Sequence, residues 1–533
     1  MAAELPVSPG PVAARWLERV EAALDWPFGA GGNPLRHLGA LGFFLFWVIL
    51  GSGIYLYFAF DATATGAYDS IDGLSRRPLG ALARGLHRYA SDALVGVIAL
   101  HLLKEVLQGR FTGARWFPWV TGVVLIAFVY ASGIGGYWLV WDEVAQFSLT
   151  ATAEWLDWLP LFGLALVRNF LESGQLTDRF YSLLVFLHIG IPLFLLAGMW
   201  LHIQRVVHAD VNPARALAAG TLAMLAALAF AKPALSQAPA DLTAMPLRLA
   251  LDWWLLFLHP LMYRTSPAAL WIAAAGLAAL LVALPWLARA PRPAVARVSP
   301  ANCNGCGRCF ADCPFGAVVI GPRSDGKRAP GEARVIPELC VACGICAGAC
   351  PSSTPFRSVT ELVTGIDMPQ RPLATLRDEL ERALGELRGG PRIVVFGCDR
   401  AVDVRGLARA DTGAVSLLCT GQLPPSFVEY ALRSGADGVL VSGCPGDGCH
   451  FRLGDAWTEQ RLAGEREPHL RASAPRERVR TVWTASAARL AHELDEFRAA
   501  LAALREAPAS RALPPRRLAG GPLREATAGT AAP

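Results

Sequence analysis

The sequence predicts an all-α membrane domain of six transmembrane helices, followed by a small α+β domain and a small α/β domain with a parallel sheet. Apolar residues make up 53% of the 533 residues and charged residues only 17%, which is typical of a membrane protein. Six apolar runs long enough to cross a bilayer lie in the first 288 residues. All twelve cysteines lie between Cys303 and Cys449, so the second half of the chain has its own chemistry.

Changes in composition divide the chain into six segments. They are an amphipathic N-terminus (1–36), a transmembrane domain (37–290), a cysteine-rich domain (298–356), a linker helix (357–390), an α/β domain (391–505) and a tail (506–533) that is expected to be disordered. The expected spans are 38–60, 86–107, 117–140, 181–204, 214–231 and 267–288. Residues 11–26 are expected to form an amphipathic helix, either lying on the membrane surface or solvated.

The charges of the loops predict the orientation in the membrane. An even number of spans places both termini on one side, and the loops on that side are richer in Lys and Arg, which places both termini in the cytoplasm. A multi-pass protein of the cytoplasmic membrane is therefore expected. The net charge of +5 is small for this length, and no basic block is interleaved with aromatic residues, which excludes nucleic acid as a partner.

Two of the expected spans carry pairs of histidines. His87 and His101 lie in the second span, and His188 and His202 lie in the fourth. Each pair is 14 residues apart, about 3.9 helical turns, so its two rings share one face about 21 Å apart. Histidines inside a bilayer are usually functional, and imidazoles facing each other across antiparallel helices can ligate haem iron. We therefore expect two b haems in a four-helix bundle, on His87 with His188 near the outer face and on His101 with His202 near the cytoplasmic face. Core histidines bonded to carbonyls are the alternative.

Residues 33–288 resemble the cytochrome b subunit of quinol–cytochrome oxidoreductases. Glycines at the family's positions, which leave room for a porphyrin edge, are Gly39, Gly53, Gly122 and Gly136. Other matching features are Arg84, Lys104, Leu176-Thr-Asp-Arg-Phe180 and Pro192. The resemblance implies that Arg84 and Lys104 bind the haem propionates.

The same resemblance implies a quinone as substrate. The family's outer-site sequence Pro-Glu-Trp-Tyr is replaced by Leu251-Asp252-Trp253-Trp254, in which Asp252 can still take a proton from a bound quinol. His208 follows the fourth span, as the family's inner quinone-site residues do. Asp252 and His208 are therefore the candidate quinone-site residues, and the face that holds the working site stays open.

Eight cysteines form two runs of identical spacing. Each run reads Cys-x2-Cys-x2-Cys-x3-Cys-Pro, which fits two [4Fe–4S] clusters in which the fourth cysteine of each run ligates the cluster of the other run. Zinc and disulfides are the disfavoured alternatives. Residues 300–356 resemble bacterial two-cluster ferredoxins, and the polar insert at 314–339 is expected to be a loop. The ligand sets are Cys303, Cys306, Cys309 and Cys350 for one cluster, and Cys340, Cys343, Cys346 and Cys313 for the other.

Short apolar runs beyond residue 390 predict a small parallel sheet. The expected strands are 392–396, 415–418 and 438–441, with a crossover helix at 424–434. Ligands of such sheets lie beyond the carboxyl ends of the strands. Four cysteines near these ends fit one [2Fe–2S] cluster, with zinc as the alternative; they are Cys398, Cys419, Cys444 and Cys449.

Residues 391–505 resemble the delta subunit of methyl-viologen-reducing hydrogenase, the electron-transfer partner of heterodisulfide reductase. The matching segments are Cys419-Thr-Gly421, Gly435-Ala-Asp-Gly438, Gly443-Cys444, Gly448-Cys449-His450 and Glu477-Arg-Val-Arg-Thr-Val-Trp483. The family usually begins with Cys-x-x-Cys, whereas this chain has Cys398-Asp-Arg-Ala401. The resemblance implies a cytoplasmic flavin or iron–sulfur protein of the heterodisulfide reductase type as partner.

These observations predict the electron-transfer subunit of a quinone-linked oxidoreductase, which connects the quinone pool to a cytoplasmic flavin or iron–sulfur enzyme. The sequence has no flavin, nucleotide or molybdenum signature, so the substrate chemistry is expected on another subunit. The cytochrome b resemblance implies a homodimer within a larger complex. The alternatives are a membrane anchor for a hydrogenase or formate dehydrogenase, and a redox-sensing or assembly subunit. The direction of electron flow is open.

Overall fold

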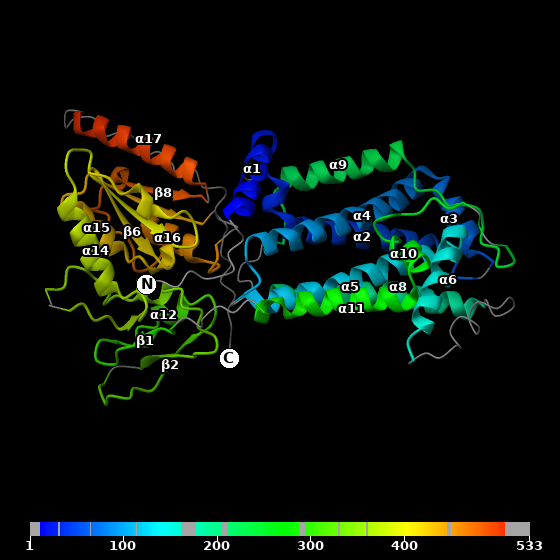
Figure 1. Ribbon diagram of the computed structural model, residues 1–533, viewed down its shortest axis with the longest axis horizontal. Coiled ribbons are helices and arrows are strands. Elements are labelled where there is room, and N and C mark those ends of the chain that lie inside the picture. Colours follow the sequence, from blue (N-terminus) through cyan, green and yellow to red (C-terminus); the bar gives the residue numbers. More distant parts are fainter. Residues whose placement is uncertain are drawn as a thin grey trace. The chain divides into compact units, whose positions relative to one another are not determined.

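The structure is a computed structural model in which the chain divides into two compact units, Met1–Ala290 and Pro291–Pro533. Figure 1 shows the elements of each unit. His208 and Leu176 lie outside the described residues, as does the expected tail beyond Glu506. The described residues are 11–29, 32–63, 65–112, 115–160, 177–204, 211–244, 246, 248–287, 294–328, 331–358, 361–444, 449–484 and 486–506.

Four long helices form the core of the first unit. Their bounds are α2 Leu38–Ala59, α4 Pro78–Leu107, α5 Trp116–Trp138 and α8 Asp178–Ile203. Helix α2 packs against α4, and α5 packs against α8, as Figure 1 shows. The apolar faces of all four helices meet in one cluster, to which they contribute Leu45, Leu94, Val129 and Leu195. The result is the helical bundle that the histidine spacing requires.

Shorter helices surround this bundle. Helix α9 packs against α4, and α11 packs against α5. Helix α1 begins at the residue where the amphipathic segment at 11–26 was expected to begin and ends two residues later. The bounds of the surrounding helices are α1 Pro11–Phe28, η1 Pro34–Arg36, α3 Ala67–Ser75, α6 Glu143–Asp157, α9 Arg215–Ala231, α10 Leu258–Arg264 and α11 Pro267–Leu287.

Each of the six expected spans coincides with a helix to within two residues or lies inside one, but only four of the described helices are long and apolar enough to cross a membrane. These four are Leu38–Ala59, Trp116–Trp138, Tyr181–Ile203 and Pro267–Leu287. The run at 214–231 forms α9, which has only 17 residues. The run at 86–107 lies in the 30-residue α4, whose middle turns carry Arg88 and Asp92 and are therefore less apolar.

The cysteine-rich part of the second unit is built from two small antiparallel sheets and two short helices. The pair β2 and β3 forms a hairpin inside the insert that was expected to be a loop. The apolar run Val318-Val-Ile320 of β2 is short, and β3 alternates charged and apolar residues, so neither segment was recognised as a strand. Strand β1 pairs with β4, so this fold extends beyond residue 356. The bounds are β1 Arg297–Val298, α12 Arg308–Ala311, β2 Val318–Gly321, β3 Glu332–Val335, α13 Ile345–Ala349 and β4 Ile366–Asp367.

A four-stranded parallel sheet in the order β6-β5-β7-β8 forms the rest of the second unit. Three strands match the expected ones, and β8 is an additional edge strand. Only one of its five residues is buried, so β8 lacks the continuous apolar run that marked the others. The bounds are β5 Ile393–Cys398, β6 Thr412–Leu417, β7 Gly438–Gly443 and β8 Val479–Trp483.

Helices cover both faces of this sheet. Alternate residues of β5 point to opposite faces: Val394 and Phe396 pack in the cluster with α14 and α15, whereas Ile393 and Val395 pack in the cluster with α17. The bounds are α14 Leu373–Glu386, η3 Val404–Leu407, η4 Thr420–Gln422, α15 Pro425–Arg433, α16 Gly454–Ala463, η6 Arg476–Arg478 and α17 Ala487–Glu506.

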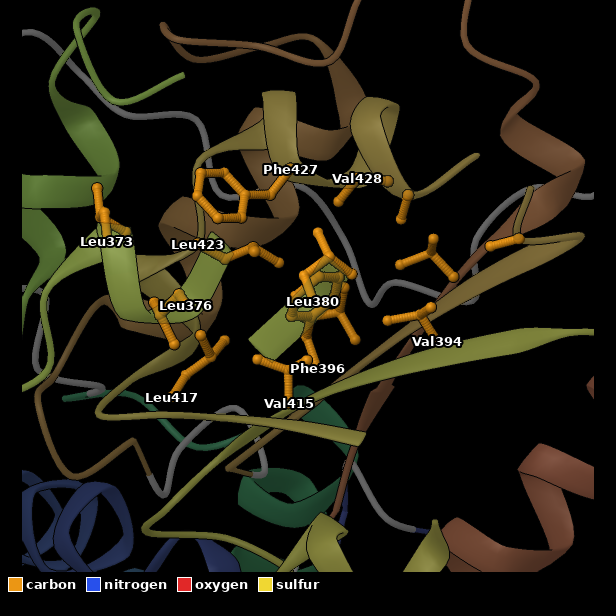
Figure 2. Packing of buried hydrophobic residues seen from close by; sticks show 14 of the residues in the cluster. Leu373, Leu376, Leu380, Val394, Phe396, Val415, Leu417, Leu423, Phe427 and Val428 are labelled. Atoms are coloured by element: carbon orange, nitrogen blue, oxygen red, sulfur yellow. The ribbon is translucent and has the colours of Figure 1, made fainter. Parts of the chain in front are cut away.

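The helix expected as a linker at 357–390 is part of the α/β domain. Leu373, Leu376 and Leu380 of α14 are buried against Val394 and other residues of the sheet, as Figure 2 shows. The apolar stripe of this helix was expected to be core, and the core it joins is that of the following domain. The boundary of that domain therefore lies before α14.

We expect Leu380→Ala to destabilise the α/β domain by about 2–5 kcal/mol, because it leaves a cavity at a fully buried position. The measurement is the midpoint of thermal unfolding of the second unit in the detergent-solubilised full chain, with limited proteolysis as the probe of unfolding. Arg382→Ala, on the exposed side of the same helix, is the matched control. Equal midpoints for the two variants would contradict the assignment of α14 to the core.

Candidate metal centres

The rings of His87 on α4 and His188 on α8 face each other, with ring centroids 6.2 Å apart and planes inclined at 67°. Metal–imidazole bonds are about 2.0–2.1 Å long and a ring centre lies roughly 1 Å behind its ligating nitrogen, so two imidazoles on one metal ion have centroids about 6 Å apart. The observed separation therefore fits one metal atom held between the two rings.

Hydrogen bonds on the opposite side of each ring orient this pair. Nδ1 of His87 lies 3.0 Å from the carbonyl oxygen of Ile49, and Nδ1 of His188 lies 3.1 Å from that of Ser132. A carbonyl oxygen only accepts, so Nδ1 is the protonated nitrogen in both rings. Nε2 then keeps its lone pair, which is the state that a metal ligand needs.

His101 and His202 form the second pair on the same two helices. They are close enough to interact electrostatically. Nδ1 of His202 lies 3.0 Å from the hydroxyl oxygen of Thr121, which orients this ring as the carbonyls orient the first pair. The antiparallel helices thus bring together the pairs that the sequence predicts, although no Nδ1 partner of this kind is found for His101 among the described residues.

Each of these histidines packs against a glycine of a neighbouring helix. A Cβ atom on the glycine would approach Cε1 of the facing ring to 2.9 Å for Gly53 with His87, 2.9 Å for Gly136 with His188, 3.1 Å for Gly122 with His202 and 3.9 Å for Gly39 with His101. At the three shorter distances a side chain would push the ring away. In the structure these glycines lie against the rings that would hold the haem, and their expected contact with a porphyrin edge stays a prediction.

The two expected propionate cations both have protein partners. Nη1 of Arg84 donates to the hydroxyl of Ser75 over 2.6 Å. Nζ of Lys104 pairs with the carboxylate of Glu21 at 2.8 Å and donates to the carbonyl of Leu35 over 2.6 Å. Lys104 therefore fastens α1 to α4, and a propionate bound there would share this cation with Glu21.

Asp252 lies in a buried polar cluster, its side chain only 2% exposed. Oδ2 accepts from the hydroxyl of Tyr137 over 2.6 Å and pairs with Arg88 at 2.7 Å. Oδ1 accepts from the backbone N–H of Trp254 over 2.8 Å, and Arg88 also pairs with Asp92. The carboxylate of Asp252 is therefore held by protein partners, and its connection to any ligand runs through Tyr137 and Arg88.

The eight cysteines of the two runs surround two separate cavities. Local turns position them: Gly307 and Gly344 precede α12 and α13 with φ of +75° and +80°, a conformation that glycine adopts readily. Each cavity combines three cysteines of one run with the fourth of the other. One is lined by Cys303, Cys306, Cys309 and Cys350, and the other by Cys313, Cys340, Cys343 and Cys346.

The chemistry of these cavities suits a metal cluster. Burial raises the pKa of the Cys309 and Cys343 thiols to about 12, because a thiolate is poorly stabilised away from water. A positive metal centre supplies the missing stabilisation and makes the thiolate the favoured form. Binding of a cluster at these sites would therefore release protons.

The last four cysteines lie at the carboxyl edge of the parallel sheet. Cys398 ends β5, and Cys419 and Cys444 follow β6 and β7. The thiols form a closed ring, in which Cys398 contacts Cys419 and Cys444, and Cys449 contacts the same two. The Sγ atoms of Cys398 and Cys444 are 4.0 Å apart. The expected convergence is therefore present, and sets of four cysteines suit both [2Fe–2S] clusters and zinc.

Two of the three cysteine sites share one apolar cluster. Cys343 of the second cavity and Cys419 of the sheet edge are both buried in it, together with Ile345 and Phe451. The first and second cavities share another cluster, which contains Cys309 and Cys346. The second cavity therefore lies between the other two sites, an order that the sequence did not reveal.

Sequence reasoning missed two glycines that line these sites. A Cβ on Gly454 would lie 2.0 Å from Sγ of Cys419, and a Cβ on Gly365 would lie 3.1 Å from Sγ of Cys350. Gly454 follows Cys449 closely, and a glycine beside a ligand segment is a signal that could have identified it. Gly365 is distant in sequence from the nearest cysteine, and no local pattern marks it.

Paired histidines within a helical bundle, followed by sets of four cysteines, are the components of a membrane electron-transfer protein. Comparison with known proteins identifies the family. Residues 33–209 match the family Cytochrome b/b6/petB, residues 302–354 the 4Fe-4S dicluster domain, and residues 393–505 the family Methyl-viologen-reducing hydrogenase, delta subunit. The chain belongs to the cytochrome b family and carries the two other domains fused behind it.

The related proteins cover the membrane part. Over 175 residues the chain is 30% identical to cytochrome b6 of Prochlorothrix hollandica, which is 32% of this chain and 78% of that protein. It is 31% identical to cytochrome b6 of Auxenochlorella protothecoides over the same length, covering 80% of that protein. Among solved structures, a chain of "Hyperthermophilic respiratory Complex III" is 19% identical with a TM-score of 0.40, over 48% of this chain and 75% of that one.

These matches refine the expectations. The chain is a multi-pass membrane electron-transfer subunit, with haem b implied by its cytochrome b region and iron–sulfur clusters by its dicluster region. The cytochrome b match ends at residue 209, whereas the expected resemblance extended to residue 288. Asp252 therefore lies beyond the matched region.

We expect Gly136→Ala to displace the ring of His188, because the added Cβ would meet Cε1 at 2.9 Å. The purified variant should lose the absorbance of one b haem and keep the other. Gly135→Ala is the matched control, since a Cβ at the adjacent glycine meets no atom within 4 Å. Full haem content in both variants, measured by the pyridine haemochrome spectrum, would contradict the role given to Gly136.

Proposed function

We propose that this chain passes electrons between the membrane quinone pool and a cytoplasmic flavin or iron–sulfur enzyme of the heterodisulfide reductase type. The observation that carries the proposal is the fusion of a cytochrome b domain to a second unit in which three cysteine sites adjoin in series. Haem and iron–sulfur centres supply one-electron transfer when bound. The chain's own residues set the order and the spacing of those centres.

His87 with His188 would hold one b haem, and His101 with His202 the other. Hydrogen bonds at Nδ1 fix the rings of three of these residues. These rings would therefore need little movement when they bind haem iron. The glycines opposite the rings keep the two helix pairs close. The proposal includes the orientation predicted by the loop charges, with both termini in the cytoplasm of a cytoplasmic-membrane protein.

In the second unit the first set of cysteines would hold one [4Fe–4S] cluster and the second set another. The four cysteines at the sheet edge would hold a [2Fe–2S] cluster. Cys306 of the first set is exposed, and exposure of a ligand favours exchange with a partner at that end. The cysteines at the sheet edge are all buried, and a cluster held there would exchange electrons with the second cysteine set through the apolar cluster that contains Cys343 and Cys419.

The quinone site is proposed from the resemblance and from the buried acid. Asp252 is connected through Tyr137 and Arg88 to the neighbourhood of His87, which would let a proton move when a quinol reacts near that haem. His208 is the candidate on the other side of the membrane. A complex of homodimeric form is proposed from the family resemblance.

A hydrogenase or formate dehydrogenase could occupy the place of the soluble enzyme. The delta-subunit match favours a hydrogenase or heterodisulfide reductase partner, because the matched family is a hydrogenase subunit. A redox-sensing or assembly role is the other alternative, and slow or absent turnover with quinone would distinguish it.

Purification of the native complex from membranes tests the main proposal. We expect a soluble flavin or iron–sulfur protein to copurify with the chain. The reduced substrate of that protein should reduce b haem and then quinone, or, for the opposite direction of flow, quinol should reduce b haem and then the soluble protein. Copurification of a hydrogenase would favour the alternative partner. A chain that carries no reducible b haem and brings no second protein would refute the proposal.

A separate prediction concerns the metal at the sheet edge. Cys398→Ala should abolish a [2Fe–2S] electron paramagnetic resonance signal and leave both [4Fe–4S] signals, because Cys398 belongs only to this site. Ala401→Ser is the matched control, since Ala401 packs against the same thiols without contributing one. Zinc in place of the expected iron and sulfide at this site would show that the alternative is correct.

The direction of electron flow depends on which face holds the working quinone site. An electron that crosses the full membrane potential gains or loses about 2.3 kcal/mol per 100 mV. Outward flow to a quinone near His87 would use this energy to pull electrons from a weak donor, and we propose that direction because no high-potential acceptor is recognisable in the sequence. In sealed vesicles an uncoupler should therefore slow quinone reduction by the soluble donor; an unchanged rate would contradict an outer-face site.

A further inference from the structure

Arg461 of α16 is a fully buried arginine between two of the cysteine sites, and its exposed fraction is 0%. Nη1 donates to the carbonyl of Gly421 over 2.8 Å, two residues after Cys419. Nη2 pairs with Asp312, the residue before Cys313, and lies 3.5 Å from the carbonyl of Ile345. One guanidinium group thus contacts the ligand-bearing segments of both the second cavity and the sheet edge.

The charge at this position is positive overall. Asp312 pairs with Arg461 and also with Arg466, at 2.7 Å in the second case, so two cations surround one carboxylate. Arginine stays protonated under all physiological conditions. Arg461 and Asp312 have side chains only 1% and 5% exposed, and buried charges are screened by salt far less than exposed ones.

The hydrogen bonds of Arg461 support the contact between these segments, but a buried ion pair is a costly means of support. Replacing a buried ion pair with well-packed apolar residues is often neutral or stabilising, because removing two charges from water is costly. The interface already has close packing of its own: a Cβ on Gly348 would lie 2.1 Å from the carbonyl oxygen of Gly421 and 2.9 Å from Nη1 of Arg461. The charge therefore provides something that apolar packing cannot.

We propose that Arg461 raises the reduction potentials of the two centres on either side of it together. The inference rests on the proposed function, in which both sites hold iron–sulfur clusters. Adding an electron makes a cluster more negative, and a nearby buried positive charge favours that state. Because one guanidinium acts on both sites, its positive charge raises both reduction potentials in the same direction.

Potentiometric titration of the full chain, followed by low-temperature electron paramagnetic resonance, tests this inference. In Arg461→Gln the ratio of reduced to oxidised cluster at a given potential should fall at least tenfold for both neighbouring centres. This corresponds to midpoint potentials that are lower by about 59 mV for one electron. Asp312→Asn should raise both potentials, because it removes the only negative charge in the group. Arg405→Gln is the control, since that side chain is 75% exposed and its loss should leave the potentials unchanged.

Opposite shifts in the two variants identify an electrostatic role, because a disturbed fold would not change sign with the charge. Unchanged potentials in Arg461→Gln with full iron and sulfide content, or shifts of one sign in both variants, would overturn the inference. If Arg461→Gln fails to assemble, Arg461→Lys should keep the native potentials, and a lowered potential in that variant with full iron and sulfide content would also overturn it. Absence of iron and sulfide from the unmodified chain would instead refute the proposed function.

Discussion

Close approach between backbone and metal-binding side chains is the constraint on which both units depend. In the bundle, Gly53 and Gly136 allow neighbouring helices to lie directly against the rings of His87 and His188. In the second unit, Gly454 lies against Cys419 in the same way. A side chain at any of these positions would move a ligand, so the helix spacing and the ligand geometry are determined together.

Several features of the sites could be predicted from the sequence because their geometry is local. His87 and His101 are 14 residues apart in the sequence, and the helical repeat then places their rings on one face of the helix. The spacing of the cysteines within each run likewise indicates the short turns that a cluster requires. The strand ends at Cys398 and Cys444 were predictable for the same reason, since a parallel sheet gathers its carboxyl ends at one edge.

Other features depend on contacts between distant segments and could not be read from the sequence. The sequence of α14 shows an apolar stripe, and the same stripe would be present in a helix that covers the following sheet and in a helix that links two domains. Asp252 was recognised as an acid in a suggestive position, but its burial against Arg88 and Tyr137 depends on the packing of three separate segments. Likewise Arg461 lies in an unremarkable helical sequence, and only the folded unit shows that its charge is enclosed between two of the cysteine sites.

The shared interface around Arg461 also constrains how the second unit is made. Met368 lines the second cavity, Gln422 packs against its Gly344, and Arg461 approaches the carbonyl of Ile345. All three residues follow all eight cysteines of the two runs. During synthesis on a ribosome the cysteines therefore emerge before the residues that enclose them. Until these later residues have been synthesised, the packing that encloses the cysteines of the second cavity cannot be completed.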